Sequence, residues 1–130
     1  MKEMEMRKEI VERLEKPNPK QVNLSNLNLQ DAELEEIFIN IQMAKPELED
    51  IFINNNQVTD IGAVILFKYL KLMPHLKLID LQFNELNEEG IRHLFALKKN
   101  NQEIAFAFFG NHLTDAGKMY EIEKLYDASK

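Results

Sequence analysis

Cysteine is absent from the 130-residue chain, which excludes disulfide bonds, thiolate zinc sites and catalysis by a thiol. Serine occurs only as Ser25 and Ser129, so we do not expect a serine nucleophile paired with a base. Glycine occurs four times, and three of these glycines belong to a repeat described below, which leaves no glycine-rich loop for a phosphate group. These absences argue against an enzyme.

Long apolar runs and an excess of positive charge are also missing. No segment approaches the roughly 18 apolar residues of a membrane span, and the N-terminus alternates in charge and has no apolar signal core. The formal net charge of −6 disfavours nucleic acid and anionic membrane as main partners. The apolar fraction of 45% is that of a globular protein. We expect one domain over residues 1–130, in a reducing compartment such as the cytoplasm.

The three histidines, His75, His93 and His112, do not have the spacing of metal ligands, and no acidic cluster has the pattern of a calcium loop. The sequence therefore predicts no metal site, no cofactor and no catalytic residue.

An internal repeat is the strongest positive signal. The stretch 76–86 has the pattern L-x-x-L-x-L-x-x-N-x-L, and the same pattern stands 28 residues earlier, over 48–58. Seven pairs of residues keep this step: Pro46 and Pro74, Leu48 and Leu76, Ile51 and Ile79, Ile53 and Leu81, Asn56 and Asn84, Val58 and Leu86, and Gly62 and Gly90. So many coincidences at one offset indicate two copies of one structural unit.

Two weaker copies flank this pair. Val22, Leu24 and Leu29 belong to the first copy, which has Leu27 at the asparagine position, and residues 104–117 form the fourth, with Asn111. Each copy predicts a short strand (49–53 in the second), a turn and a helix, and the helices are expected over 31–44, 60–72, 88–99 and 115–126. The helix over 60–72 is apolar around most of its circumference and should be the most buried. We expect Asp31 and Thr59 to cap helices, and the repeat glycines to let the helices approach the sheet closely.

An amphipathic helix is predicted over residues 2–16, with Met6, Ile10 and Leu14 on its apolar face. Such a helix would cover the exposed apolar end of the array. We therefore divide the chain into an N-terminal helical cap (1–19), the repeats (20–113) and a C-terminal capping helix (114–130).

This consensus, at 27–29 residues with a helix in every unit, resembles the leucine-rich repeat over about residues 20–117. Its period and helix length resemble the ribonuclease-inhibitor-like subfamily, although the cysteine that often shares the asparagine position there is absent. The resemblance implies an α/β fold, namely a leucine-rich-repeat solenoid shaped as a short right-handed horseshoe. It also implies a parallel sheet on the concave side, helices on the convex side, and usually a protein partner in the concavity.

The candidate binding residues follow from the alternation of side chains along a strand. The outward positions include three phenylalanines amid polar and acidic neighbours, and the predicted patch consists of Asp50, Phe52, Asn54, Asp80, Gln82, Phe83 and Phe109. Exposed aromatic side chains in such surroundings are typical of a protein-binding patch. Alternatively, the rings pack against each other or a neighbouring loop, or the strand register is shifted by one residue.

The sequence thus favours a non-catalytic protein–protein interaction module, expected to be a monomer, that binds a protein partner through the concave face. One alternative is an actin-capping or regulatory protein resembling the repeat domain of tropomodulin, and another is a bacterial effector acting in a host cell. No motif in the chain is specific to either alternative.

Overall fold

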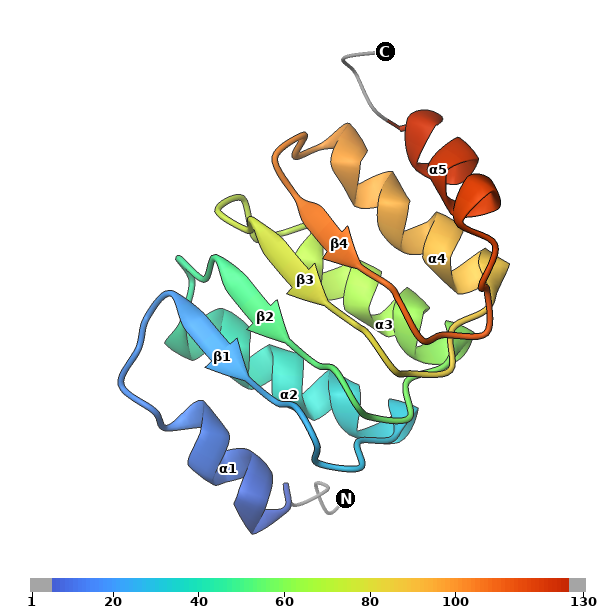
Figure 1. The fold of residues 1–130 in the computed structure, drawn as a ribbon. Helices are drawn as coiled ribbons and strands as arrows, with labels where there is room; N and C mark the ends of the chain where they lie inside the picture. Colours follow the sequence, from blue (N-terminus) through green and yellow to red (C-terminus); the bar gives the residue numbers. More distant parts are fainter. Residues whose placement is uncertain (1–5, 127–130) are drawn as a thin grey trace.

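The computed structural model describes residues 6–126. In chain order its elements are α1 (Lys8–Leu14), β1 (Gln21–Asn23), α2 (Asp31–Ala44), β2 (Asp50–Phe52), α3 (Asp60–Leu70), β3 (Leu78–Asp80), α4 (Glu88–Phe95), the 3-10 helix η1 (Ala96–Lys99), β4 (Ala105–Ala107) and α5 (Ala116–Lys124). The strands form one parallel sheet in the order β1-β2-β3-β4. Figure 1 shows α2, α3 and α4 along one side of this sheet, with α1 next to β1 and α5 beyond α4. The predicted arrangement of a parallel sheet with helices on one side is confirmed.

The boundaries of the elements differ from the predicted ones at their ends. The first helix runs from Lys8 to Leu14, whereas the sequence predicts it over 2–16, and residues 2–5 of that prediction lie outside the described part of the chain. Strand 49–53 shortens to 50–52, and helix 60–72 ends at Leu70. Helix 88–99 changes to a 3-10 helix after Phe95, and the last helix runs from Ala116 to Lys124. Helix ends often tighten or fray in this way, because their terminal backbone groups lack partners within the helix.

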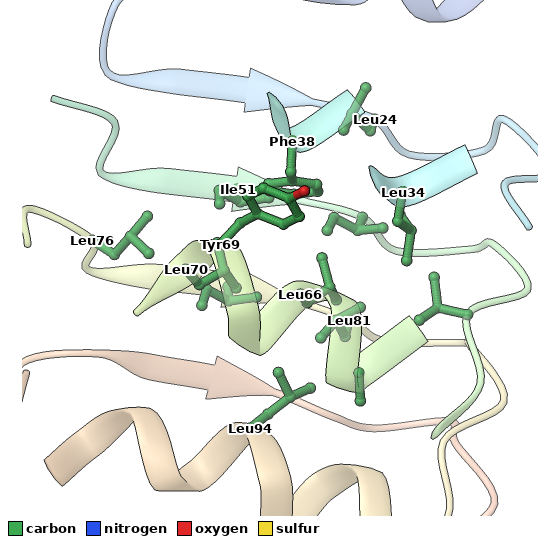
Figure 2. Packing of buried hydrophobic residues seen from close by; sticks show 14 of the residues in the cluster. Leu24, Leu34, Phe38, Ile51, Leu66, Tyr69, Leu70, Leu76, Leu81 and Leu94 are labelled. Carbon is green, nitrogen blue, oxygen red and sulfur yellow. The ribbon is translucent and has the colours of Figure 1, made fainter. Parts of the chain in front are cut away.

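The strand register places equivalent apolar residues of successive repeats side by side. Val22 pairs with Ile51, Ile51 with Ile79, and Ile79 with Phe106. In Figure 2, residues from the strand layer such as Leu24, Ile51 and Leu81 lie among Phe38, Leu66 and Leu94 of the helices. Full burial of a leucine or isoleucine side chain stabilises a fold by about 1.5–3 kcal/mol. Most of the core is therefore shared between neighbouring repeats.

Helix α3 has an exposed side, although its sequence is apolar around most of its circumference. Leu66 and Leu70 face the core, but Ile61 is 69% exposed and Val64 is 53% exposed. The helix contacts α2 on one side and α4 on the other, and it covers the sheet. A helix in this position keeps one outward stripe, which its apolar sequence does not reveal.

The repeat asparagines connect each unit to the one before it. The Asn84 side chain accepts a hydrogen bond from Val58 N (2.9 Å) and donates to the carbonyls of Ile53 (3.0 Å) and Leu81 (3.1 Å). Only 5% of Asn84 is exposed. The predicted role of this residue, to satisfy backbone groups where the strand turns away, is confirmed.

The other two asparagines repeat this geometry. Asn56 accepts from the amides of Leu27 and Leu29, and Asn111 accepts from Leu86 N. Each asparagine reaches back to the strand of the preceding repeat, and among the described residues no strand precedes β1 for such a side chain to bond. Leu27 takes the position there and is buried in the core.

Gly62 and Gly90 make room for a carboxylate of the preceding repeat, and the expectation that they lie against the sheet is wrong. A Cβ built at Gly62 would overlap the Asp31 carboxylate, and one at Gly90 would overlap that of Asp60. Asp31 accepts a hydrogen bond from Thr59 N (2.9 Å), and Asp60 accepts one from Asn87 N (2.8 Å). Asp31 thus serves the next helix, where unpaired amides and the helix dipole favour an anion.

The capping residues of α2 and α3 can be compared with the predicted ones. Gln30, and not Asp31, is the N-cap of α2. Thr59 caps α3 as predicted, because its hydroxyl accepts from Ile61 N at 3.2 Å.

Helix α1 is attached to the first repeat by an ion pair and an apolar contact. Arg7 Nε donates to Glu33 Oε2 at 2.7 Å, Arg7 Nη2 donates to the Leu27 carbonyl at 2.6 Å, and Ile10 is fully buried. Burial alone would raise the pKa of Glu33, but the hydrogen bonds from Arg7 and from Gln30 N outweigh it and lower this pKa.

We expect Asn84→Ala to lower the free energy of unfolding by about 1–3 kcal/mol, because it leaves buried backbone groups of two repeats without partners. The matched control is Gln82→Ala, which removes a half-buried amide two residues away and should change stability by no more than about 0.5 kcal/mol. Urea denaturation measures both. Equal midpoints for the two variants would contradict the buried role of Asn84.

The glycines offer a second matched pair. Gly90→Ala should destabilise the protein by about 1–3 kcal/mol, because the new methyl group displaces the Asp60 carboxylate from Asn87 N. Gly117 occupies the same repeat position in α5, but the nearest atom to a Cβ there is its exposed neighbour Asp115, at 3.3 Å. Gly117→Ala should therefore change the thermal midpoint only slightly, and a loss as large as that of Gly90→Ala would contradict this explanation.

A pH dependence follows from the lowered pKa of Glu33. A carboxylate whose pKa is lower in the folded state contributes stability that is present above its unfolded pKa and is lost as the pH falls through the folded pKa. Arg7→Gln should therefore destabilise the protein at pH 7, and the deficit should shrink below the ordinary glutamate pKa of 4.5. Arg13→Gln is the control, because Arg13 bonds the carbonyl and amide oxygens of Asn23. Thermal melts that show the same pH profile for both variants would contradict the assignment.

Candidate protein-binding face

The face of the sheet away from the helices carries three rows of side chains. The strand register defines two of them, Gln21, Asp50, Leu78 and Ala105, and then Asn23, Phe52, Asp80 and Ala107. Backbone hydrogen bonds between repeats continue past the strands, from Asn26 N to the Asn54 carbonyl, from Asn55 N to the Gln82 carbonyl and from Phe83 N to the Phe109 carbonyl. They align a third row, which consists of Ser25, Asn54, Gln82 and Phe109.

Six of the seven predicted patch residues lie in these rows. Asp50, Phe52 and Asp80 are in the strands, and Asn54, Gln82 and Phe109 follow directly after them. The alternative of a register shifted by one residue is contradicted, because Ile51, Ile53, Ile79 and Leu81 are fully buried. The seventh residue, Phe83, lies in the turn beyond the third row.

The two carboxylates lie diagonally across β2 and β3, since Asp50 pairs with Leu78 and Phe52 with Asp80. Asp80 Oδ1 accepts hydrogen bonds from the Gln82 backbone amide (3.0 Å) and side-chain amide (3.1 Å). Asp50 accepts from the Gln21 side chain at 3.1 Å. These contacts orient both carboxylates without neutralising them, so the face carries negative charge.

Phe83 has a left-handed backbone conformation, with φ of +57°. The equivalent residues of the other repeats are Asn26 (+57°), Asn55 (+59°) and Gly110 (+85°), which are residue types that adopt this conformation readily. A bulky residue held there costs about 1–2 kcal/mol. Sequence reasoning missed this feature, although asparagine and glycine at the equivalent positions were a usable signal.

The Phe83 ring forms an edge-to-face pair with Phe109, with ring centroids 5.6 Å apart and an interplanar angle of 88°. The ring also lies over Gly110, where a Cβ would overlap it. Even so, Phe83 remains 48% exposed and Phe109 72% exposed. The alternative that the rings pack against each other thus holds for this pair, but the packing leaves both rings open to solvent.

Phe52 is separate from the pair. It is half-buried in β2, between Asn23 of β1 and Asp80 of β3. The structure therefore divides the three predicted aromatic residues into one paired site at the C-terminal end of the face and one single ring near its centre.

Other ionisable and aromatic groups of the described residues lie outside the sheet face. Among residues 6–126, no group of three or more His, Cys, Asp or Glu side chains could hold a metal ion. His93 packs edge-on against Phe67, with ring centroids 4.7 Å apart. The hydrogen bonds of Tyr69 and Lys68 lower the pKa of Glu35, but these groups join α2 to α3 on the helical side. No helix in the described part of the chain is long and apolar enough to cross a membrane.

The chain matches no protein-family model and no curated protein. Among solved structures it is similar to "Leiomodin-1 Actin-Binding Site 2 (ABS2)", with a TM-score of 0.71 and 20% sequence identity over 90% of this chain and 70% of that chain. At this level of identity the similarity shows the fold alone. The chain has the leucine-rich-repeat-like α/β fold that its sequence predicts.

Proposed function

We propose that this protein is a non-catalytic interaction module that binds a protein partner through the outer face of its sheet. The observation that carries the proposal is the exposed pair of Phe83 and Phe109, one ring of which is held in a left-handed backbone conformation. Backbone strain of this kind persists where the surrounding structure enforces it, and it is concentrated at functional sites. Large aromatic side chains also supply much of the binding energy of protein interfaces.

The remaining patch residues extend this site across the sheet. Phe52 offers a second apolar contact, and Asp50 and Asp80 add negative potential beside it. Asn54 and Gln82 offer amide groups in the row that ends at Phe109. A partner with a basic or mixed surface fits this face, and its association should slow as the salt concentration rises.

Several finer assignments belong to the same proposal. They are membership of the ribonuclease-inhibitor-like subfamily, a cytoplasmic location, and the division into an N-terminal cap (1–19), repeats (20–113) and a C-terminal capping helix (114–130). The repeat period supports the first of these, the absence of cysteine is compatible with the second, and the positions of α1 and α5 at opposite ends of the array support the third.

An actin-binding regulator is the second candidate function. Its support is the similarity to leiomodin-1 actin-binding site 2 in fold. Co-sedimentation with actin filaments and native electrophoresis with monomeric actin test this candidate directly. Failure of both would exclude actin and leave the interaction module in place.

The main test uses substitutions borrowed from the other repeats. Phe83→Asn introduces the residue found at the equivalent positions 26 and 55, and Phe109→Asn introduces the residue found at position 54. The double variant should keep the fold, because asparagine accepts the left-handed conformation. Its affinity for a partner captured by the wild type should fall by about 2 kcal/mol or more, which is roughly 30-fold.

The matched control is Ile61→Asn with Val64→Asn, which removes two exposed apolar side chains from the helical side. Affinity capture with quantitative mass spectrometry identifies the partner, and titration with the purified partner measures the affinities. Retained binding by the Phe83/Phe109 variant, or an equal loss in the control, would contradict the proposed face.

A further inference from the structure

The two edges of the sheet differ in what covers the edge strand. At the β1 edge, α1 packs against the strand, and Arg13 Nη1 donates to the outward carbonyl of Asn23 at 2.9 Å. At the other edge, β4 pairs with β3 alone among the described strands. The β1 edge is therefore covered by α1 and Arg13, whereas β4 has a neighbouring strand on one side only among the described residues.

The repeat geometry identifies the backbone groups on the open side of β4. In β2, the side facing the next repeat uses the Glu49 carbonyl, which accepts from Lys77 N (2.7 Å), and Ile53 N, which donates to the Asp80 carbonyl (2.8 Å). The equivalent groups in the fourth repeat are the Ile104 carbonyl and Phe108 N. They form the ready-made edge to which a further strand can pair.

An apolar hollow of about 420 Å³ lies beside this edge, between β4 and α5. Its lining includes Phe95, Phe106, Phe108, Leu113, Met119 and Tyr120. Phe106 and Phe108 stand where the second repeat has Ile51 and Ile53, both fully buried, yet Phe106 is only half-buried. The hollow is thus the space into which the inward side chains of another strand would project.

The helix position next to this space is already occupied. Figure 1 shows α5 beside α4, in the same layer as the earlier helices, and the two helices are in contact. Among residues 6–126, the position that no element fills is therefore the one next to β4 in the sheet layer. A second copy paired edge to edge with its helices on the same side would bring its own α5 close to this α5, so the space does not suit a second copy in that orientation.

We propose that this open edge binds an extended segment of a partner protein, which pairs with β4 as an added strand and places large apolar side chains at alternate positions into the hollow. Addition of a strand to an exposed sheet edge is a general mode of peptide recognition, in which backbone hydrogen bonds hold the peptide and pockets select its alternate side chains. This site adjoins the outer face of the sheet, because Phe109 and Gly110 also line the hollow, and Met119 and Tyr120 of α5 form its other wall.

The charges around the hollow indicate what net charge the bound segment can carry. Among the residues that line the hollow only Glu123 is charged, and Lys98 pairs with it at 3.6 Å. The whole chain, by contrast, carries −6. The end of the array therefore fits an apolar segment without strong net charge, and binding there should depend little on salt.

The test uses a synthetic peptide of residues 75–84 of this chain as the probe. This segment contains β3, which completes the equivalent edge of β2 in the structure. The control peptide carries Ile79→Ser and Leu81→Ser, which remove the two inward apolar side chains. A labelled peptide is titrated against the full chain, and amide hydrogen exchange is followed at Phe106 and Phe108.

Two protein variants locate the binding site. Tyr120→Glu places a carboxylate at the rim of the hollow, and α5 should stay folded because Lys124 lies four residues further along the helix. Ile61→Glu is the matched control on the helical side, where Ile61 is similarly exposed. We expect the peptide to bind the Tyr120→Glu variant at least about tenfold more weakly than the wild type, and the Ile61→Glu variant equally well.

The expected result also includes slower exchange at Phe106 when the peptide is bound. The proposal is overturned if the peptide does not bind at about 1 mM, the weak end of measurable affinity. It is also overturned if the serine peptide binds equally well, if Tyr120→Glu has no effect, or if exchange at Phe106 does not change. A concentration-dependent dimer in sedimentation equilibrium that Tyr120→Glu dissociates would make a second copy the occupant.

Discussion

The hydrogen bonds of Asn56, Asn84 and Asn111 are the interaction on which the rest of the structure depends. Each strand is only three residues long and must turn away from the sheet within the core, where unpaired backbone groups are costly. The three side-chain amides bond these groups within their own turn and in the preceding repeat. One residue type therefore satisfies the turn and also sets the spacing of the stack.

The carboxylates of Asp31 and Asp60 provide a second connection on the helical side. Each accepts a hydrogen bond from the backbone amide of the next helix's N-cap residue, and Gly62 and Gly90 leave the space for it. The stack is thus held at the strand ends by amides and at the helix starts by carboxylates, with the apolar core between them. In such an array each unit depends on its neighbours, so unsatisfied surface is concentrated at the two ends. At the N-terminal end α1 covers this surface, and at the C-terminal end the open edge of β4 is left uncovered by the described residues.

Because the backbone conformation repeats from unit to unit, some positions can carry different side chains in different repeats. The left-handed turn position holds asparagine in the first two repeats, phenylalanine in the third and glycine in the fourth. Gly110 accommodates the Phe83 ring, and Phe109 packs against its edge. The aromatic pair is thus a local departure from the repeat. It is built by Phe83, Phe109 and Gly110, at a turn where the other repeats have asparagine or glycine. This departure distinguishes the C-terminal half of the sheet face from the rest of it.

The sequence by itself determined the repeat, the inward residues, the strand register and the burial of the asparagines. It could do so because a period of 27–29 residues and the alternation along a strand leave one arrangement that buries the pattern Ile51, Ile53, Ile79 and Leu81. The outward rows, and with them the positions of Asp50, Phe52 and Asp80, follow from the same alternation.

Only the tertiary structure decided the features that depend on how closely neighbours approach and where the stack stops. The exposure of Ile61, the carboxylate beside Gly90 and the pairing of Phe83 with Phe109 each involve contacts between repeats, which no pattern within one repeat encodes. The hollow beside Phe106 has the same origin. Phe106 occupies the repeat position at which Ile51 is fully buried. Phe106 is only half-buried because no further strand lies next to β4 among the described residues.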